Sequence, residues 1–266
     1  MGSAELGESS LEWRGVISAC PSCSLAWTST VASPVEVNET IIGGWDCKPN
    51  EAKYQVLLTD RKRNVKCGGS LLSSKWVLTA AHCDSSDLKV YVGLQDLKDL
   101  NDMKKKFQPV KVKSKIKHPE YVKRELLNDI MLIKLKKEIK TASLVHLPTE
   151  CKKHGDKAPE KKDLLVAGWG SLGGGENPKS PTKLQCVIIQ KAKCPSDLDP
   201  PITPDAFCAG KGNQKTRCGD SGGGLVYKKE VYGVVQSDFD PDDDYPSIFT
   251  SVCFHLAWIK KETKLS

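Results

Sequence analysis

The stretch Asn128-Asp129-Ile130-Met131-Leu132-Ile133-Lys134-Leu135 places an aspartate at the mouth of a strongly apolar strand. Short runs rich in Val, Ile, Leu, Tyr and Trp recur on both sides of it, separated by Gly, Pro, Asn and Asp. Besides residues 130–135, these runs are 54–58, 76–79, 88–92, 110–116, 164–169, 184–189 and 231–235. This pattern predicts an all-β protein, either a barrel or a sandwich.

One helix is expected, at the C-terminal end of the chain. Residues 252–262 place apolar side chains among lysines with helical spacing. The polar, lysine-rich stretch 151–163 is interpreted as a connector between two β halves of similar size. Residues 173–181, rich in Gly and Pro, are expected to form a mobile surface loop.

Length and cysteine content indicate the kind of protein. The 266 residues suffice for one large β domain or two smaller ones. The 11 cysteines lack the paired short spacings of zinc modules, so they predict a disulfide framework and an oxidising compartment. Residues 16–32 are only patchily apolar and make a poor signal peptide. No run reaches the roughly 18 apolar residues of a membrane span, so a soluble mature protein is expected.

The charge is uneven along the chain. Residues 1–40 carry five Glu and one Arg, so removing them raises the formal charge from +7 to +11. Seven lysines crowd one stretch: Lys104, Lys105, Lys106, Lys111, Lys113, Lys115 and Lys117. They could attract a sulfated glycan or another polyanion, or simply form a solvated face. No nucleic-acid motif accompanies them, so nucleic-acid binding is not predicted.

Three segments carry the groups that serine-based hydrolysis requires: a base, an acid that orients the base, and amide donors for an oxyanion. Leu78-Thr79-Ala80-Ala81-His82-Cys83 places a histidine after a strand and beside a cysteine. Asp129 lies at the mouth of its apolar strand. Gly219-Asp220-Ser221-Gly222-Gly223 places a serine in a turn whose glycines allow close approach of a substrate carbonyl.

These three contexts, in the order His, Asp, Ser, resemble the trypsin-like serine proteases of the chymotrypsin fold, and most closely the vertebrate trypsinogens. Ile41-Ile42-Gly43-Gly44 and Gly168-Trp169-Gly170 appear in the family order as well. The resemblance implies two antiparallel Greek-key β barrels with a C-terminal helix. It also implies a leader or pro-segment at 1–40 and a protease domain at 41–266, whose barrels divide near residue 150, into about 41–150 and about 151–266.

The resemblance assigns a role to each matching residue. His82 is the expected general base, Asp129 its orienting acid and Ser221 the nucleophile. The amides of Gly219 and Ser221 form the expected oxyanion hole. The other histidines lack such contexts and are interpreted as ordinary: His118, His146, His154 and His255.

Activation in this family frees the amine of the Ile-Ile-Gly-Gly segment, here Ile41, which then pairs with the aspartate before the nucleophile, here Asp220. The residue before the cut is Thr40, so cleavage by trypsin or enteropeptidase is not predicted. Asn38-Glu39-Thr40 is also an N-glycosylation sequon that could shield the bond.

The family's cysteine pattern implies four disulfides: Cys47–Cys186, Cys67–Cys83, Cys151–Cys253 and Cys194–Cys208. Cys218 lacks its family partner and is expected to be a free thiol near the site. Pairing of Cys218 with Cys20 or Cys23 is the alternative.

The specificity pocket departs from the family. Thr216 stands where trypsin has its pocket-floor aspartate, so cleavage after Lys or Arg is not predicted. Arg217 could select acidic residues or fill the pocket. One residue of the family pattern is absent between Cys218 and Gly219, which could tighten the oxyanion turn.

The strand that lines this pocket in the family also differs. The residues that align with its Ser-Trp-Gly segment are Gln236-Ser237-Asp238 here, and this alignment could shift by one residue. Gln236, Asp238 and Ser247 complete the predicted pocket. The stretch 94–106 lacks the acidic ligands of a calcium loop, so no metal and no cofactor are predicted.

The sequence therefore predicts a secreted, monomeric serine endopeptidase that acts on proteins or peptides with non-tryptic specificity. The alternative is a catalytically weak or inactive homologue that works by binding.

Overall fold

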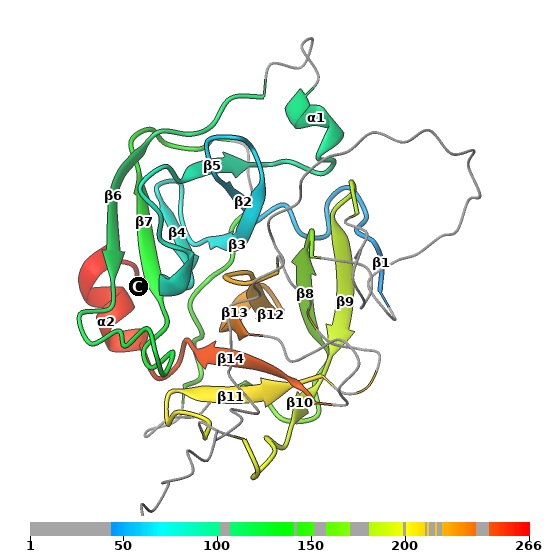
Figure 1. The fold of residues 1–266 in the computed structure, drawn as a ribbon, viewed down its shortest axis with the longest axis vertical. Coiled ribbons are helices and arrows are strands. Elements are labelled where there is room, and N and C mark those ends of the chain that lie inside the picture. The colour runs from blue at the N-terminus through cyan, green and yellow to red at the C-terminus, as the bar shows by residue number, and fades with distance from the viewer. Residues whose placement is uncertain are drawn as a thin grey trace, which may run out of the picture.

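The computed structural model describes residues 44–101, 107–140, 143–151, 158–170, 181–198, 201–210, 212, 216, 220–237 and 245–266. Two antiparallel sheets and a C-terminal helix form the molecule (Figure 1). The expected all-β, trypsin-like fold is confirmed. The expected loop at 173–181 lies almost entirely outside the described residues.

The first sheet has six strands in the order β5-β2-β3-β4-β7-β6. In chain order they are β2 (Gln55–Thr59), β3 (Val65–Leu71), β4 (Trp76–Thr79), β5 (Lys89–Val92), β6 (Val112–Lys117) and β7 (Met131–Leu135). The amide of Val110, just before β6, donates to the carbonyl of Val90 in β5 at 2.7 Å. This bond joins the two edges, so the sheet closes into a barrel.

The second sheet has eight strands in the order β1-β9-β8-β12-β13-β14-β11-β10. They are β1 (Trp45–Asp46), β8 (Leu164–Gly168), β9 (Gln185–Ile189), β10 (Lys191–Ala192), β11 (Ala206–Ala209), β12 (Gly224–Tyr227), β13 (Glu230–Ser237) and β14 (Ser247–Ser251). β9 runs almost directly into β10, and β10 pairs with β11. The second sheet therefore also curls back towards its own start.

Three short helices accompany the sheets: η1 (Ala81–Cys83), α1 (Lys98–Asn101) and α2 (Leu256–Thr263). The predicted C-terminal helix is present but begins four residues later than expected, because residues 252–255 form turns. It ends where Lys264 adopts a φ of 61° and its amide bonds to the Lys260 carbonyl.

All eight predicted apolar runs overlap strands, whereas the two-residue strands β1 and β10 and the longer strands β3, β11, β12 and β14 were not predicted. β3 contains Gly68 and Gly69, which weaken any strand signal. Their small size serves the packing of the barrels, since a Cβ at Gly68 would lie 2.6 Å from Gln55 Nε2 and 3.2 Å from Gly223 Cα. A close approach between β3 and the turn before β12 therefore requires glycine.

Two main apolar cores stabilise the barrels. The larger core includes Leu57, Leu78 and Ile133 of the first sheet, all fully buried. The second core is centred on Phe207 and Phe249, whose rings stack at 5.7 Å. Each fully buried side chain of this size contributes roughly 1.5–3 kcal/mol.

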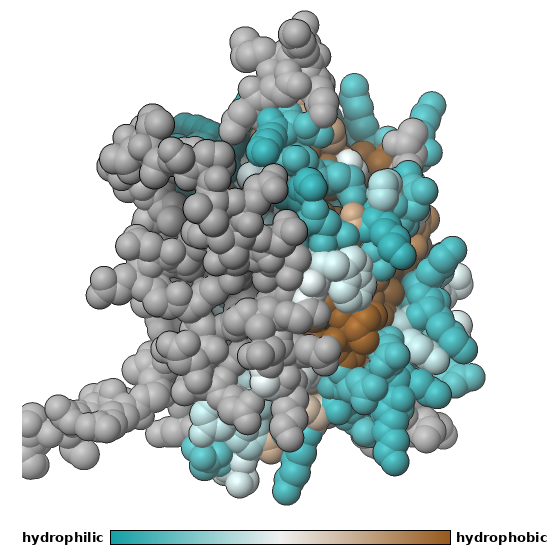
Figure 2. Space-filling model, turned by 90° about the vertical axis from the view of Figure 1, so that its right-hand side faces the viewer, coloured by the Kyte–Doolittle hydropathy of each residue, from teal (hydrophilic) through white to brown (hydrophobic). Residues whose placement is uncertain are grey.

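The surface is largely polar. Figure 2 shows hydrophilic side chains around a smaller apolar area on one face. Among the described residues, Val122 and Phe254 are the exposed large apolar side chains. No helix in the described part of the chain is long and apolar enough to cross a membrane.

Candidate active site

His82 and Asp129 are brought together by the pairing of β4 with β7. Thr79 at the end of β4 lies opposite Met131 at the start of β7. His82 follows β4 in η1, and Asp129 precedes β7, so both lie at the same end of the strand pair. Asp129 Oδ2 is 2.6 Å from His82 Nδ1, and Asp129 Oδ1 accepts the His82 backbone N–H at 2.8 Å.

This pair has the geometry of an oriented base. Two hydrogen bonds fix the Asp129 carboxylate against both the ring and the backbone of His82. Asp129 is fully buried, and the His82 side chain is 13% exposed. An acid in this position holds the imidazole in one tautomer and leaves Nε2 to act on a hydroxyl.

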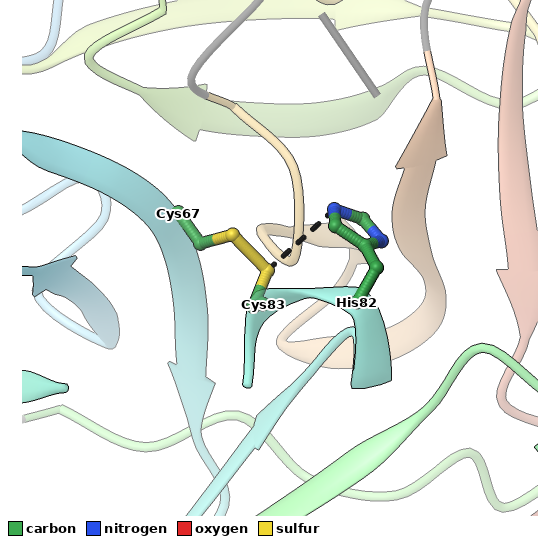
Figure 3. Close-up of side chains that lie close together, drawn as sticks. All are labelled: Cys67, His82 and Cys83. Carbon is green, nitrogen blue, oxygen red and sulfur yellow. Dashed lines mark hydrogen bonds between the residues drawn. A yellow bond between two sulfur atoms is a disulfide. The ribbon is translucent and has the colours of Figure 1, made fainter. Parts of the chain in front are cut away.

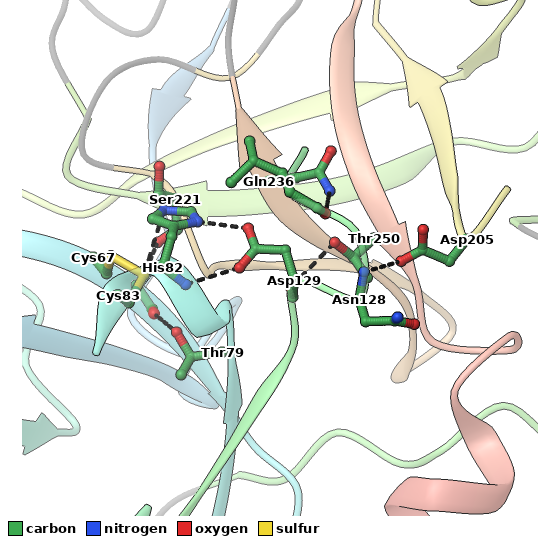
Figure 4. Close-up of polar contacts among 12 residues, drawn as sticks. Cys67, Thr79, His82, Cys83, Asn128, Asp129, Asp205, Ser221, Gln236 and Thr250 are labelled. Atoms are coloured by element: carbon green, nitrogen blue, oxygen red, sulfur yellow. Dashed lines mark hydrogen bonds and ion pairs between the residues drawn. A yellow bond between two sulfur atoms is a disulfide. The ribbon is translucent and has the colours of Figure 1, made fainter. Parts of the chain in front are cut away.

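Ser221 lies beside this pair, in the turn that leads into β12. Its carbonyl accepts the N–H of Gly68 in β3 at 2.7 Å. Cys83 Sγ lies 3.7 Å from His82 Nε2 and 3.8 Å from the Ser221 carbonyl oxygen, so both residues contact the same sulfur (Figures 3 and 4). The serine comes from the second sheet and the histidine from the first.

Steric crowding explains why a glycine follows Ser221 directly. Gly222 has a φ of 81°, and a Cβ there would lie 2.3 Å from Thr79 Oγ1 and 2.7 Å from the Gly68 carbonyl. Its N–H donates to the Val235 carbonyl at 2.8 Å. Only glycine accommodates both this backbone conformation and this space.

Asp220 is buried beneath the turn and faces the Gly168-Trp169-Gly170 segment. Its Oδ1 accepts the Gly170 N–H at 2.8 Å. A Cβ at Gly168 would lie 1.9 Å from Asp220 Oδ1, and one at Gly170 would lie 2.5 Å from Oδ2. The two glycines therefore provide the space for the Asp220 carboxylate.

The structure brings together some of the predicted pocket residues. Thr216 and Ser247 are both buried, and the Thr216 N–H donates to Ser247 Oγ at 2.9 Å. Gln236 lies at the irregularity of the β13–β14 ladder, between Val235 and Ser237. Its Nε2 donates to the Leu126 carbonyl at 2.6 Å.

Several predicted residues lie outside the described part of the chain. These are Ile41 with Thr40 and Asn38, Arg217, Gly219, Asp238, the cysteines Cys20, Cys23 and Cys218, and Lys104–Lys106.

The sequence did not point to the residues that surround Asp129. Thr250 Oγ1 donates to the Asp129 carbonyl at 3.2 Å, and Asn128 is buried next to it (Figure 4). Burial, and after it the charge of Asp129, raise the pKa of Tyr121. Thr250 and Tyr121 carry no local motif, and the contact of Thr250 comes from a distant segment.

Four disulfides join the cysteine pairs that the resemblance implies: Cys47–Cys186, Cys67–Cys83, Cys151–Cys253 and Cys194–Cys208. His82 lies close to two of these cysteines, Cys67 and Cys83 (Figure 3). Because the two sulfurs are bonded to each other, they provide no thiolates, and this group does not form a metal site.

The two barrels, with a His–Asp pair from one and a serine turn from the other, define the class of double-barrel serine proteases. Comparison with known sequences agrees, since the profile of the Trypsin family matches residues 41–259. The chain belongs to the trypsin family of serine endopeptidases.

Similar proteins include several vertebrate members of this family. Trypsin-3 of Salmo salar is 36% identical over 238 residues, covering 86% of this chain and 95% of that protein. Trypsin-4 of Rattus norvegicus is 36% identical, covering 88% of this chain and 94% of its own. Kallikrein-4 of Homo sapiens is 34% identical, covering 85% of this chain and 88% of its own.

Proposed function

We propose that this protein is a secreted, monomeric serine endopeptidase that hydrolyses peptide bonds through Ser221, His82 and Asp129, with a specificity other than that of trypsin. Residues 1–40 would be a segment removed before activity, and residues 41–266 the protease unit, with its barrels at about 41–150 and 151–266. Four disulfides fit an extracellular protein.

The reaction follows from the roles of the three side chains. His82 Nε2 takes the proton of the Ser221 hydroxyl as its oxygen attacks the peptide carbonyl. The protonated ring then gives that proton to the leaving amine, which leaves an acyl-enzyme. Water attacks the acyl-enzyme with His82 again as the base, and Ser221 is regenerated.

The developing oxyanion would be stabilised by the amides of Gly219 and Ser221. Ser221 is fixed at its backbone by the hydrogen bond that its carbonyl accepts from the Gly68 N–H. The resemblance supports an ion pair between Asp220 and the Ile41 amine as the event that completes this turn.

Specificity would come from a pocket floor with hydroxyl groups rather than a carboxylate. Thr216 and Ser247 are bonded to each other in the interior. Neither side chain carries a charge that could pair with a substrate Lys or Arg, so the main interaction that favours cleavage after Lys or Arg is missing.

The observation that carries the proposal is the buried His82–Asp129 pair, with bonds of 2.6 and 2.8 Å, beside a serine from the other barrel. The test is labelling by a fluorophosphonate probe on the chain processed to begin at Ile41, with Ser221→Ala as control. Labelling that disappears in the control is the expected result.

An unlabelled protein that is folded, monomeric and carries a free Ile41 amine would contradict the enzyme. The chain would then be the alternative, an inactive homologue that acts by binding. A peptide library on the labelled protein would give its specificity.

A second candidate function is polyanion binding, which the geometry of β6 favours. Val112, Ser114 and Ile116 are half-buried in this strand, whereas the alternating lysines are exposed. Lys113, Lys115 and Lys117 therefore share one outward face, and Lys111 just before β6 is exposed as well. Lys115 and Lys117 form ion pairs with Asp84, and these pairs restrict the positions of their side chains. We call Lys111, Lys113, Lys115 and Lys117 the lysine row.

The lysine row suits a sulfated glycan. The test is elution of the full chain from heparin in a salt gradient, with Lys111→Gln/Lys113→Gln against the equally charged control Lys260→Gln/Lys261→Gln on α2. Earlier elution of the β6 variant than of the control supports a glycan site. Equal elution of the two variants, or release of the unmodified chain well below physiological salt, rejects it.

A further inference from the structure

Asn128, the residue before Asp129, is held by side chains from the other barrel. Its backbone has a φ of 54°, in the left-handed region that few residues other than glycine adopt readily. Its N–H donates to Asp205 Oδ2 at 3.0 Å. Asp205 lies just before β11, so the bond connects the mouth of β7 with the second sheet.

His255 holds the side chain of the same residue. Asn128 Nδ2 donates to the Glu120 carbonyl at 3.0 Å, which orients the amide and directs Oδ1 towards His255. His255 Nε2 lies 3.0 Å from that oxygen, and an amide oxygen can only accept. A proton on Nε2 donates to this oxygen and completes the bond.

The surroundings of His255 keep its ring in place. Nδ1 lies 2.8 Å from the Ser251 carbonyl, and Nε2 lies 3.7 Å from Asp205 Oδ2. Burial lowers the pKa of His255, whereas the Ser251 carbonyl and the Asp205 charge act in the opposite direction. His118 packs edge-on against the ring at 5.1 Å.

All three members of this cluster are buried: His255 is 3% exposed, Asn128 6% and Asp205 0%. Buried polar groups are costly unless they are paired, so these bonds favour a single arrangement. Thr250 of β14 adds a bond to the Asp129 carbonyl at 3.2 Å. Residues 128–129 are thus held at the Asn128 amide by Asp205 and at the Asp129 carbonyl by Thr250 (Figure 4), and at the Asn128 side chain by His255.

We propose that Asp205 and His255 are positioning residues for the reaction: they fix Asn128 from the second barrel and thereby hold the Asp129 carboxylate in register with His82. The inference rests on the proposed function. It assigns a task to a histidine that the sequence alone marked as ordinary. Neither residue touches the reacting atoms; both act through Asn128.

The expected consequence is a loss in the chemical step rather than in substrate binding. An Asp129 that shifts relative to His82 stabilises the protonated ring less, and misplacement of about 1 Å costs roughly 100-fold in rate. We expect His255→Phe, which keeps a ring but removes both ring nitrogens, to lower kcat about 10- to 100-fold while KM changes little. The acid limb of kcat/KM should move to lower pH.

Two further variants make this result specific. His255→Gln keeps a side-chain donor and should recover part of kcat. Tyr232→Phe removes one ring hydrogen bond, to Glu230, in the same barrel and away from Asp129, and should leave kcat and the pH profile unchanged. Active sites are titrated with the probe first, so that loss of folded protein is not counted as loss of rate.

The inference is overturned if His255→Phe, per titrated site, keeps the kcat and the acid limb of the unmodified chain. It is also overturned if His255→Gln is no better than His255→Phe. A structural role alone would reduce the number of titrated sites without moving the acid limb.

A second measurement separates this inference from the proposed function. The proton between His82 Nδ1 and Asp129 gives a strongly deshielded NMR resonance, which can be followed in the full chain without any activity. If the unmodified protein is never labelled, the proposed function fails, but the resonance still reports on the positioning. It should shift or broaden in His255→Phe and not in Tyr232→Phe; an unchanged resonance in His255→Phe would reject the positioning role.

Discussion

Gly222, directly after the proposed nucleophile, combines a positive φ with crowding. Its φ is 81°, and a Cβ would lie 2.3 Å from Thr79 Oγ1. Gly93 has nearly the same φ, 79°, with no atom within 4 Å of its Cβ position. A substitution at Gly93 therefore tests backbone strain alone, whereas a substitution at Gly222 tests strain together with steric conflict.

We expect Gly222→Ala to lower the free energy of unfolding by about 3 kcal/mol or more, because strain and overpacking add. Gly93→Ala should cost about 1 kcal/mol from strain alone. Urea unfolding of both variants checks this. Equal losses in the two would mean that the turn after Ser221 relaxes without conflict.

The proposed pocket-floor residue, Thr216, gives a second prediction. Thr216 is buried and bonded to Ser247, where the family pattern of trypsin has an aspartate. We expect Thr216→Asp to raise kcat/KM for substrates cleaved after Arg about 10- to 100-fold, because a charge-assisted bond becomes available. Thr216→Asn, of similar shape but without charge, should not. A peptide library gives the answer, and equal profiles for Asp and Asn would remove Thr216 from the pocket.

At the scale of elements, the disulfide between β3 and η1 supports both sides of the site. Cys83 Sγ contacts His82 Nε2 and the Ser221 carbonyl, and the Cys67–Cys83 pair spans 16 residues. Cys194–Cys208 spans 14 residues in the second barrel, near β11. Loops of this length contribute about 3 kcal/mol each to stability.

Replacing either pair by serines should therefore cost a similar amount of stability, whereas only Cys67→Ser/Cys83→Ser should slow probe labelling at temperatures where both proteins are folded. Thermal unfolding and labelling rates measure the two effects. Similar labelling rates in both variants would show that the sulfur contacts have no part in the site.

The ion pairs of Asp84 with Lys115 and Lys117 connect the end of η1 to β6 and make part of the stability depend on pH. Asp84 follows η1; burial raises the pKa of Asp84, but hydrogen bonds from Lys115 and Lys117 outweigh burial and hold the pKa below its ordinary value of 3.8. A depressed carboxyl pKa stabilises the folded state above the unfolded value, and this stability is lost as the pH falls through the folded value. The Asp84 contribution should therefore be fully present at neutral pH, begin to decline near pH 4 and be lost as the pH falls through the lower folded pKa.

Asp84→Asn should consequently lower stability at pH 7, by about 0.5 kcal/mol for a partly exposed pair, and have a smaller effect at pH 3. Guanidinium unfolding between pH 7 and 3 measures this difference. Glu138→Gln, which removes an exposed pair with Lys75, is the control. A loss that does not depend on pH would contradict the assignment to Asp84 ionisation.

At the scale of the whole molecule, activity should depend on processing before Ile41. Asp220 is fully buried behind Ser221, and the family pattern pairs it with the freed Ile41 amine. We expect the processed chain to label at least about tenfold faster than the full chain, because an ion pair at Asp220 orders the oxyanion turn. Asp220→Asn in the processed chain should lose this gain. Equal rates for the full and processed chains would show that processing does not control the site.

Much of the fold could be predicted from local sequence. All eight apolar runs became strands, because burial of one side of a short β-branched segment is a local, periodic property. The four disulfides and the pairing of His82 with Asp129 were implied by the resemblance to the trypsin-like family. β3 was not predicted, because Gly68 weakens its local strand signal. The reason for this glycine, the close approach of Gly223 from the other barrel, appears only in the tertiary structure.

The sequence by itself determined the strand pattern, the segments that carry the candidate triad, and the departures at Thr216 and Gln236. Only the tertiary structure decided what surrounds them. His255 and Asn128 are 127 residues apart, and Asn128 and Asp205 are 77 apart, yet they form one buried cluster beside Asp129. No local pattern marks such contacts, because they exist only once two barrels pack and unpaired polar groups must find partners in the interior.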